Sequence, residues 1–237
     1  MKLIADQIQM AFGRQEVLKG ASFAFEQGKI YALLGRNGAG KTTFFNCVNE
    51  DLKMQGGRFL LEDEAGGQRP LTSEEVGYVL STPVVPEFLT AREIMKFYLD
   101  INQGKIESPL TPDKYLEGVL IEDDDRNKLL RDYSHGMKNK IQMLLNLMAD
   151  PKVLLLDEPL TSLDVVAQDE IKTVLKKRKA GHITILSTHI LELALDVCDE
   201  VVILHNGLLS LIDRGQLDNE EYKARILAAL REEQSND

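Results

Sequence analysis

Residues 35–42 have the types and spacing of a loop that binds phosphate groups. Their sequence, Gly-Arg-Asn-Gly-Ala-Gly-Lys-Thr, matches the pattern G-x-x-x-x-G-K-[ST] at every specified position. Strand-like residues 29–34 precede the loop and a helix-compatible run follows it, which is the context that this motif requires. The alternative is a glycine-rich turn that only joins a strand to a helix, and the flanking elements argue against it.

Each part of this phosphate loop has a chemical task. The glycines let backbone N–H groups and the positive end of the next helix converge on an anion. We expect Lys41 to reach the β- and γ-phosphates of a nucleoside triphosphate and Thr42 to offer its hydroxyl to Mg²⁺. The pattern therefore predicts binding of ATP with Mg²⁺. The predicted nucleotide-binding residues of the loop are Gly35, Asn37, Gly38, Ala39, Gly40, Lys41, Thr42 and Thr43.

Two carboxylates and a histidine follow predicted buried strands later in the chain. Asp157 and Glu158 come directly after apolar residues 153–156, and His189 follows strand-like residues 183–187. Parallel α/β sheets bind ligands at the carboxyl ends of their strands, so we expect these three side chains near the phosphate loop. Asp157 would hold Mg²⁺ mainly through water, and Glu158 would accept a proton from, or orient, the attacking water. His189 would hydrogen-bond a γ-phosphate oxygen. Taken alone, the acidic pair could be a solvated strand edge and the histidine a capping residue.

The order of the predicted elements indicates an α/β fold. It resembles a P-loop NTPase, with a parallel sheet flanked by helices, an N-terminal antiparallel β subdomain and a helical subdomain. The predicted elements are antiparallel strands over 2–25 and 58–62, a mostly helical segment over 91–149, buried parallel strands over 153–157 and 183–187, and a hairpin over 201–209 that turns at Asn206-Gly207.

We predict one domain over residues 1–237. Residues 1–90 and 150–215 would form the ATP-binding core with its β subdomain, residues 91–149 the helical subdomain, and residues 216–237 an acidic C-terminal helix. The acidic run 122–125 is expected to be a solvated helix start, with a metal site as the alternative.

Composition restricts the class of protein. The chain has 237 residues, of which 43% are hydrophobic and 28% charged, as expected for a soluble globular protein. Its net charge of −10 argues against a nucleic-acid partner. Neither a signal peptide nor an apolar stretch of about 20 residues is found, so any membrane role would be peripheral. Only Cys47 and Cys198 occur, which favours the reducing cytoplasm.

Two further segments make the chain resemble the ATPase subunits of ABC transporters. Residues 133–138, Tyr-Ser-His-Gly-Met-Lys, are similar to the family signature, and residues 159–164, Pro-Leu-Thr-Ser-Leu-Asp, are similar to its D-loop. With the phosphate loop, the acidic pair and His189, they stand in the family's order, and the resemblance extends over residues 3–213. The Gly-Met ending of the signature resembles that of bacterial export- and immunity-type members.

The resemblance implies a two-fold dimer that holds two ATP molecules. Each ATP would lie between the phosphate loop of one chain and Ser134 and Gly136 of the other. A helix that begins at Ser134 would direct a hydroxyl and backbone N–H groups at an anion, although the same residues could be a cap without a ligand. The family pattern also places Asp164 in the nucleotide site. It implies that Phe12 stacks on adenine, and the alternative is a Phe packed in the core.

The chain departs from the family pattern at three positions. Ser81 stands where the family has a glutamine that meets Mg²⁺ and the attacking water and links to the permease. The shorter hydroxyl of Ser81 could reach Mg²⁺ only through an intervening water. His135 and Met137 replace the Gly and Gln of the most frequent signature.

The resemblance implies an ATP hydrolase that powers a separately encoded integral membrane permease. Such a subunit would be cytoplasmic and peripheral at the inner face of the cell membrane, and residues 81–93 would contact the permease. Its dimer partner would be a second copy or a paralogous ATPase. An ATP-gated regulatory or assembly module with little turnover is the alternative. The soluble ABC ATPases of DNA repair and translation fit less well, because this chain has neither a long coiled coil nor a second ATPase domain.

Overall fold

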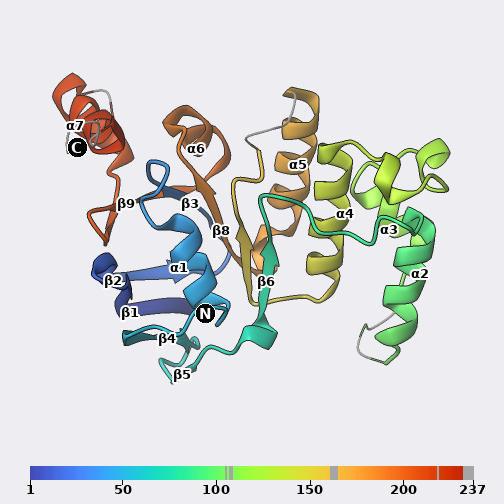
Figure 1. The fold of residues 1–237 in the computed structure, drawn as a ribbon, viewed down its shortest axis with the longest axis horizontal. Coiled ribbons are helices and arrows are strands. Elements are labelled where there is room, and N and C mark those ends of the chain that lie inside the picture. Colours follow the sequence, from blue (N-terminus) through green and yellow to red (C-terminus); the bar gives the residue numbers. More distant parts are fainter. Residues whose placement is uncertain (105, 107–108, 161–164, 218, 232–237) are drawn as a thin grey trace.

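An antiparallel sheet forms from N-terminal residues whose side chains alternate between buried and exposed (Figure 1). The structure is a computed structural model that describes all residues except 105, 107–108, 161–164, 218 and 232–237. The strand order in this sheet is β2-β1-β4-β5. Its strands are β1 (Lys2–Phe12), β2 (Gln15–Glu26), β4 (Gly56–Glu62) and the short β5 (Gln68–Pro70).

The second sheet contains the strands that the sequence predicts to be buried. Its order is β10-β9-β3-β8-β7-β6, and every neighbouring pair is parallel except β9 and β10. The β9–β10 hairpin turns at Asn206 and Gly207, whose φ angles of 51° and 78° give the predicted Asn-Gly turn. The strands are β3 (Ile30–Leu34), β6 (Val76–Val79), β7 (Val153–Leu156), β8 (Ile183–Thr188), β9 (Glu200–His205) and β10 (Leu208–Leu211).

The parallel sheet separates two hydrophobic cores. In β3, Tyr31 and Leu33 face the core shared with the antiparallel sheet and α1 (Lys41–Val48), whereas Ile30 and Ala32 face the core shared with the other helices. Helix α1 therefore packs between the two sheets, with Phe44 buried there. Residues that alternate along one strand thus fill both cores.

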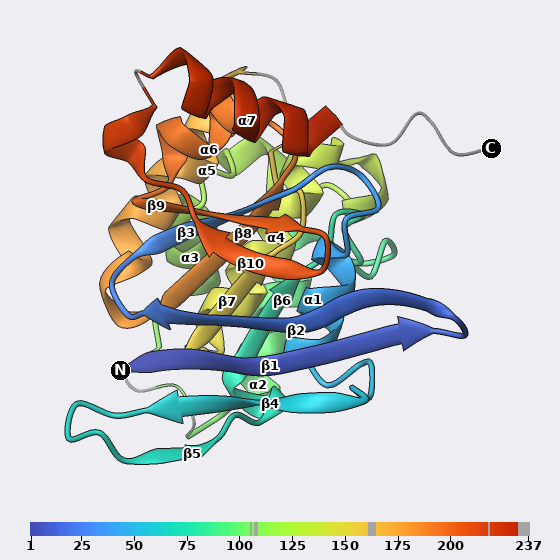
Figure 2. The same cartoon turned by 90° about the vertical axis from the view of Figure 1, so that its left-hand side faces the viewer.

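The helices on the other face include those of the helical region. The α-helices on that side are α2 (Ala91–Ile101), α3 (Pro112–Gly118), α4 (His135–Met148), α5 (Val165–Arg178), α6 (Leu191–Val197) and α7 (Glu220–Arg231). Thr90 and Glu93 form a capping box at the start of α2. Figure 2 shows α7 alongside α6, at the opposite end of the molecule from the antiparallel sheet. Within the described residues, α7 is a helix inside the predicted C-terminal helical range of 216–237.

One helix face is only partly covered, and one local expectation differs from the structure. Residues 94, 97, 98 and 101 share a helical spacing on α2, but Phe97 and Ile101 are 56% and 59% exposed. The acidic run forms a 3₁₀ turn, Asp123–Asp125, rather than an α-helix start. Arg92 pairs with Asp123 at 2.7 Å, so this carboxylate has a cationic side-chain partner.

These elements confirm the predicted fold class, including the antiparallel β subdomain and the mostly helical region. The exact domain boundaries stay a prediction. Within the part of the chain that the structure describes, no helix is long and apolar enough to cross a bilayer.

Candidate functional site

The phosphate loop lies between the carboxyl end of β3 and the start of α1 (Figure 1). Gly38 and Gly40 have φ angles of 80° and 102°, a region that L side chains rarely adopt. At Gly40 a Cβ atom would lie 2.6 Å from a methyl group of Val17. Glycine is therefore required there both by backbone conformation and by the close approach of β2. The loop ends where α1 presents its N-terminal N–H groups.

Backbone carbonyl groups of the phosphate loop hold the side chain of Lys41 in place. Its side chain is 6% exposed, and its Nζ atom donates hydrogen bonds to the carbonyl oxygens of Gly35 at 2.8 Å and Arg36 at 3.2 Å. The same Nζ atom lies 3.3 Å from Oε1 of Glu158. A buried cation with donors directed at the loop is suited to the phosphates of a nucleotide.

Asp157 is fixed by hydroxyl groups from two different elements. Thr42 Oγ1 on α1 donates to Asp157 Oδ2 at 2.8 Å, and Ser187 Oγ on β8 donates to Asp157 Oδ1 at 2.6 Å. Asp157 is 4% exposed, and its backbone N–H donates to the carbonyl of Val79 on β6 at 2.9 Å. The pair of Thr42 and Asp157 places two oxygen ligands side by side, and oxygen ligands are what Mg²⁺ prefers.

The strand order explains why these residues meet. β8 lies between β3 and β7, so the carboxyl ends of these three strands are adjacent. Ser187 was not among the predicted site residues. Its only signal in the sequence is a hydroxyl that interrupts a buried apolar strand next to Thr188 and His189.

Glu158 and His189 face each other at the same edge of the sheet. His189 Nδ1 lies 3.2 Å from both carboxylate oxygens of Glu158, and the two side chains are 39% and 18% exposed, respectively. The backbone N–H of Glu158 donates to Ser187 Oγ at 2.9 Å. Glu158 has a φ of 48°, the left-handed region that is strained for a residue with a side chain. Such strain is concentrated at functional sites, where surrounding contacts hold it in place.

Ser134 and Gly136 lie at a second helix start, on the other side of the molecule's centre. Ser134 is the N-cap of α4, and its Oγ accepts a hydrogen bond from the backbone N–H of Met137 at 3.2 Å. Figure 1 shows α4 beyond β6 and α5 when viewed from α1. Within one chain the structure thus brings Lys41, Asp157, Glu158 and His189 together but leaves the start of α4 apart from them.

Three further predicted site residues are Phe12, Ser81 and Asp164. Phe12 ends β1 and is 49% exposed, so it is not a core residue and its ring is accessible. Ser81 is exposed and follows β6 by two residues, beyond the Val79 carbonyl that binds Asp157. Asp164 lies outside the described residues. No cluster of three or more His, Cys, Asp or Glu side chains suited to a metal occurs among the described residues. Of the predicted metal residues, Thr42 contacts Asp157, whereas Ser81 is exposed.

A glycine-rich loop, a buried lysine and an Asp-Glu pair at adjacent strand ends define a P-loop nucleotide-binding protein. The ABC transporter family profile matches residues 18–161 of this chain. The chain therefore belongs to the ABC transporter family, among its ATP-binding proteins, as the sequence resemblance predicts.

Individual relatives agree with this assignment. An uncharacterized ABC transporter ATP-binding protein from Nostoc sp. is 33% identical over 85% of this chain, which spans only 60% of that protein's length. The lantibiotic transport ATP-binding protein SrtF of Streptococcus pyogenes is 27% identical, with 86% of this chain and 87% of SrtF covered. A solved structure of an ATP-binding subunit of an ABC transporter matches with a TM-score of 0.78 at 25% identity, covering 96% of this chain and all of that one.

Proposed function

We propose that this chain binds ATP with Mg²⁺ and hydrolyses it. The observation that carries the proposal is the position of the Glu158 carboxylate, between Lys41 Nζ at 3.3 Å and His189 Nδ1 at 3.2 Å. It lies at the sheet edge where Thr42 contacts Asp157. A carboxylate held there can accept a proton from a water molecule near the terminal phosphate.

The surrounding residues have separate tasks in this proposal. Backbone N–H groups of residues 35–43 would cradle the phosphates, and Lys41 would neutralise their charge. Thr42 and Asp157 would hold Mg²⁺, which supplies charge stabilisation to the phosphate that is transferred. His189 would keep Glu158 and the attacking water aligned, because its imidazole already lies within hydrogen-bonding distance of both carboxylate oxygens. The exposed Phe12 would stack on the adenine.

We further propose that ATP turnover drives a separately encoded membrane permease. Residues 81–93 follow β6 and include the start of α2, and in this segment Val84 and Phe88 are 70% and 77% exposed. Large exposed apolar side chains in one segment suit a protein partner. The chain would then be a cytoplasmic subunit, peripheral at the inner face of the membrane. The similarity to a protein named for lantibiotic transport supports an export-type system.

The proposal includes a dimer, formed with a second copy or with a paralogue. Ser134 and Gly136 lie apart from the phosphate loop within one chain, so a partner is needed to bring the start of an α4 to each ATP (Figure 1). Asp164 comes shortly after Glu158 in the sequence. We propose that it borders the same nucleotide.

Phosphate release by the purified chain with Mg-ATP tests the proposal, with Lys41→Ala as the inactive reference. We expect release by the wild type to exceed that of Lys41→Ala by about 10²-fold or more. The alternative is an ATP-gated regulatory or assembly module with little turnover, and the short side chain at Ser81 is the observation that favours it. If the wild type binds ATP but releases phosphate no faster than Lys41→Ala, both alone and with the permease, the result would support this alternative.

A further inference from the structure

The segment between β6 and α2 is bonded directly to the residues that lead into α4. The backbone N–H of Arg131 donates to the carbonyl of Glu87 at 3.1 Å, and that of Leu130 donates to the carbonyl of Leu89 at 2.8 Å. Thr90 and Leu129 form an isolated antiparallel bridge beside these bonds. Residues 129–132 come immediately before the signature residues 133–138. The path of the chain into the signature therefore depends on residues 87–90.

A side-chain ion pair continues this connection onto α4 itself. Lys138 Nζ lies 2.6 Å from Oε1 of Glu87, and the two side chains are 17% and 63% exposed. The backbone N–H of Lys138 donates to the carbonyl of Ser134 at 3.0 Å, so Lys138 stands one helical turn after the signature serine. Glu87 is thus linked both to the chain before Ser134 and to the helix after it.

The charge of Lys138 is unfavourable in its own helix. A cation in the first turns of a helix opposes the helix dipole, and the first turn of α4 contains no acidic residue. The carboxylate of Glu87 therefore supplies from another segment the negative charge that α4 lacks. The position of α4 relative to residues 87–90 affects the strength of this pair directly.

The same short segment carries the exposed apolar residues of the proposed permease surface. Phe88 is adjacent to Glu87 in the chain, and Val84 precedes it by three residues. The proposed permease surface and the ion pair therefore lie next to each other in the chain.

We infer that Glu87 and Lys138 are positioning residues that hold Ser134 where it can close on the ATP of a partner chain. The inference rests on the proposed function, since it assigns positioning residues to the same composite site. A solvent-screened ion pair without any effect on Ser134 is the competing explanation.

Two measurements on the same variants test the inference. The first is hydrogen exchange over residues 129–137 in the monomer without nucleotide. The second is the ATP concentration at half-maximal dimerisation, measured by light scattering in a Glu158→Gln background where hydrolysis is slow. The variants are Glu87→Gln, Lys138→Gln, Lys138→Glu and the charge swap Glu87→Lys with Lys138→Glu. Lys114→Gln is the matched control, because it breaks an exposed pair with Glu117 in the same region.

We expect each neutralising variant to speed exchange over residues 129–137 by up to about fivefold and to raise the half-maximal ATP concentration by a similar factor. Lys138→Glu should have the largest effect, because it places two carboxylates together, and the charge swap should restore both measurements. ATP affinity of the monomer should stay unchanged in all variants, since the phosphate loop is not touched. Lys114→Gln should match the parent.

Several results would overturn the inference. They are unchanged exchange in every variant, a charge swap no better than Lys138→Glu, or faster exchange with an unaltered dimerisation curve. Failure of the Glu158→Gln parent to dimerise with ATP would contradict the proposed dimer instead. In that case the exchange data alone would decide whether the pair positions the signature.

Discussion

The two ends of the proposed nucleotide site differ in how much of the site one chain completes. In the core, side chains from α1, from β8 and from the residues that follow β7 and β8 already contact one another. These residues are Lys41, Thr42, Asp157, Glu158, Ser187 and His189. At the start of α4, the hydroxyl of Ser134 accepts a hydrogen bond from its own helix.

This difference follows from how each end is built. The core site is fixed by the strand order β3-β8-β7, so folding of one sheet brings its residues together. The start of α4 is a capped helix end on a separate group of helices, and capping satisfies it without any ligand. We therefore expect core substitutions to alter chemistry within a chain and α4 substitutions to alter association between chains.

The largest expected effect lies in the core, at Glu158. Glu158→Gln removes the proton acceptor but retains the shape of the side chain, so ATP binding should persist while turnover falls by about 10²-fold or more. The variant should also accumulate as an ATP-bound dimer. Steady-state phosphate release and light scattering measure these outcomes.

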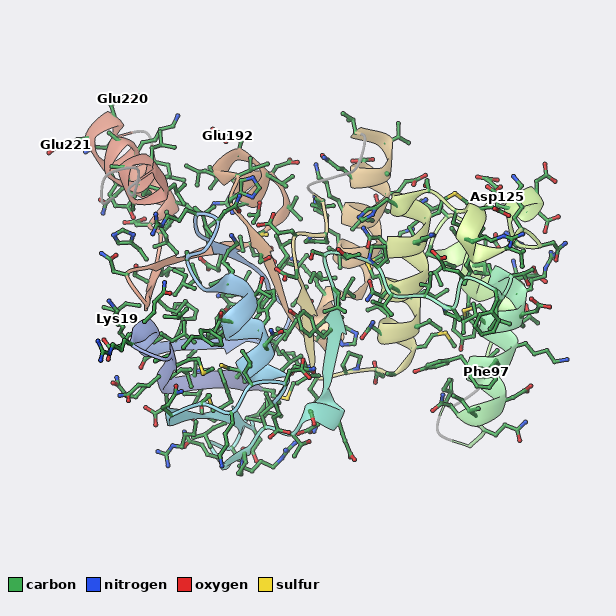
Figure 3. The ribbon with its side chains drawn as sticks, in the orientation of Figure 1. Lys19, Phe97, Asp125, Glu192, Glu220 and Glu221 are labelled. Carbon is green, nitrogen blue, oxygen red and sulfur yellow. The ribbon has the colours of Figure 1, made fainter. Side chains whose placement is uncertain are left out.

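Glu192 supplies the matched control for this prediction. It is an exposed carboxylate at the start of α6, three residues after His189 (Figure 3). Glu192→Gln should leave turnover within about twofold of wild type, because surface substitutions away from a site have small effects. Turnover of Glu158→Gln near that of Glu192→Gln would show that Glu158 is not the base.

The next effect lies at the other end of the site. Ser134→Arg places a long cation at the cap of α4, and we expect it to abolish ATP-dependent dimerisation in the Glu158→Gln background. Nucleotide affinity of the monomer should be unchanged, which equilibrium binding of a fluorescent ATP analogue measures. Thr111→Arg, which alters the cap of α3 in the same helical region, should leave dimerisation intact. A weaker affinity of the Ser134→Arg monomer for the ATP analogue would contradict the proposed difference between the two ends of the site.

Sequence patterns predict many of the strands and turns because the signals for these elements are local. Buried strands appear as unbroken apolar runs, as in β7, and the β9–β10 turn appears as Asn206-Gly207. The coverage of α2 could not be predicted in this way. Phe97 repeats with the buried residues of a helix, yet it is 56% exposed among the described residues. Periodicity identifies a face of a helix but not whether a neighbour covers it.

Candidate site residues could be predicted where their residue type is uncommon for that place in the chain. Lys41 and the Asp157–Glu158 pair are uncommon in this sense, and the structure places them together. Ser187 was missed because a hydroxyl in a buried strand has several ordinary explanations. The positive φ of Glu158 could not be predicted either, since the chain around it imposes that conformation. Both features depend on contacts between distant parts of the sequence.

A smaller effect is expected at Ser81, which belongs to the segment that joins the two regions. A serine hydroxyl leaves the attacking water less well held than a glutamine amide would, so Ser81→Gln should raise basal turnover several-fold. Ser81→Ala should resemble the wild type if water already fills the place. Basal phosphate release from all three forms is the measurement. Three equal rates would mean that position 81 does not touch the chemistry.

The smallest effect concerns acid stability, where the core and the helical region again differ. Glu75 is 17% exposed, and Arg69, with a hydrogen bond at 2.7 Å, together with Lys152 lowers the pKa of its carboxyl from 4.5 to about 2. A lowered folded-state pKa stabilises the fold above about pH 4.5, and that stability is lost as the pH falls toward 2.

Over this range the wild type should lose about 1 kcal/mol more unfolding free energy than Glu75→Gln. In the helical region Arg92 lowers the pKa of Asp113, but this carboxyl is exposed, so Asp113→Asn should change the acid profile less. Urea unfolding between pH 6 and 2.5 compares the three proteins. If the unfolding free energies of the wild type and Glu75→Gln fall in parallel as the pH is lowered, Glu75 does not contribute to the loss of stability in acid.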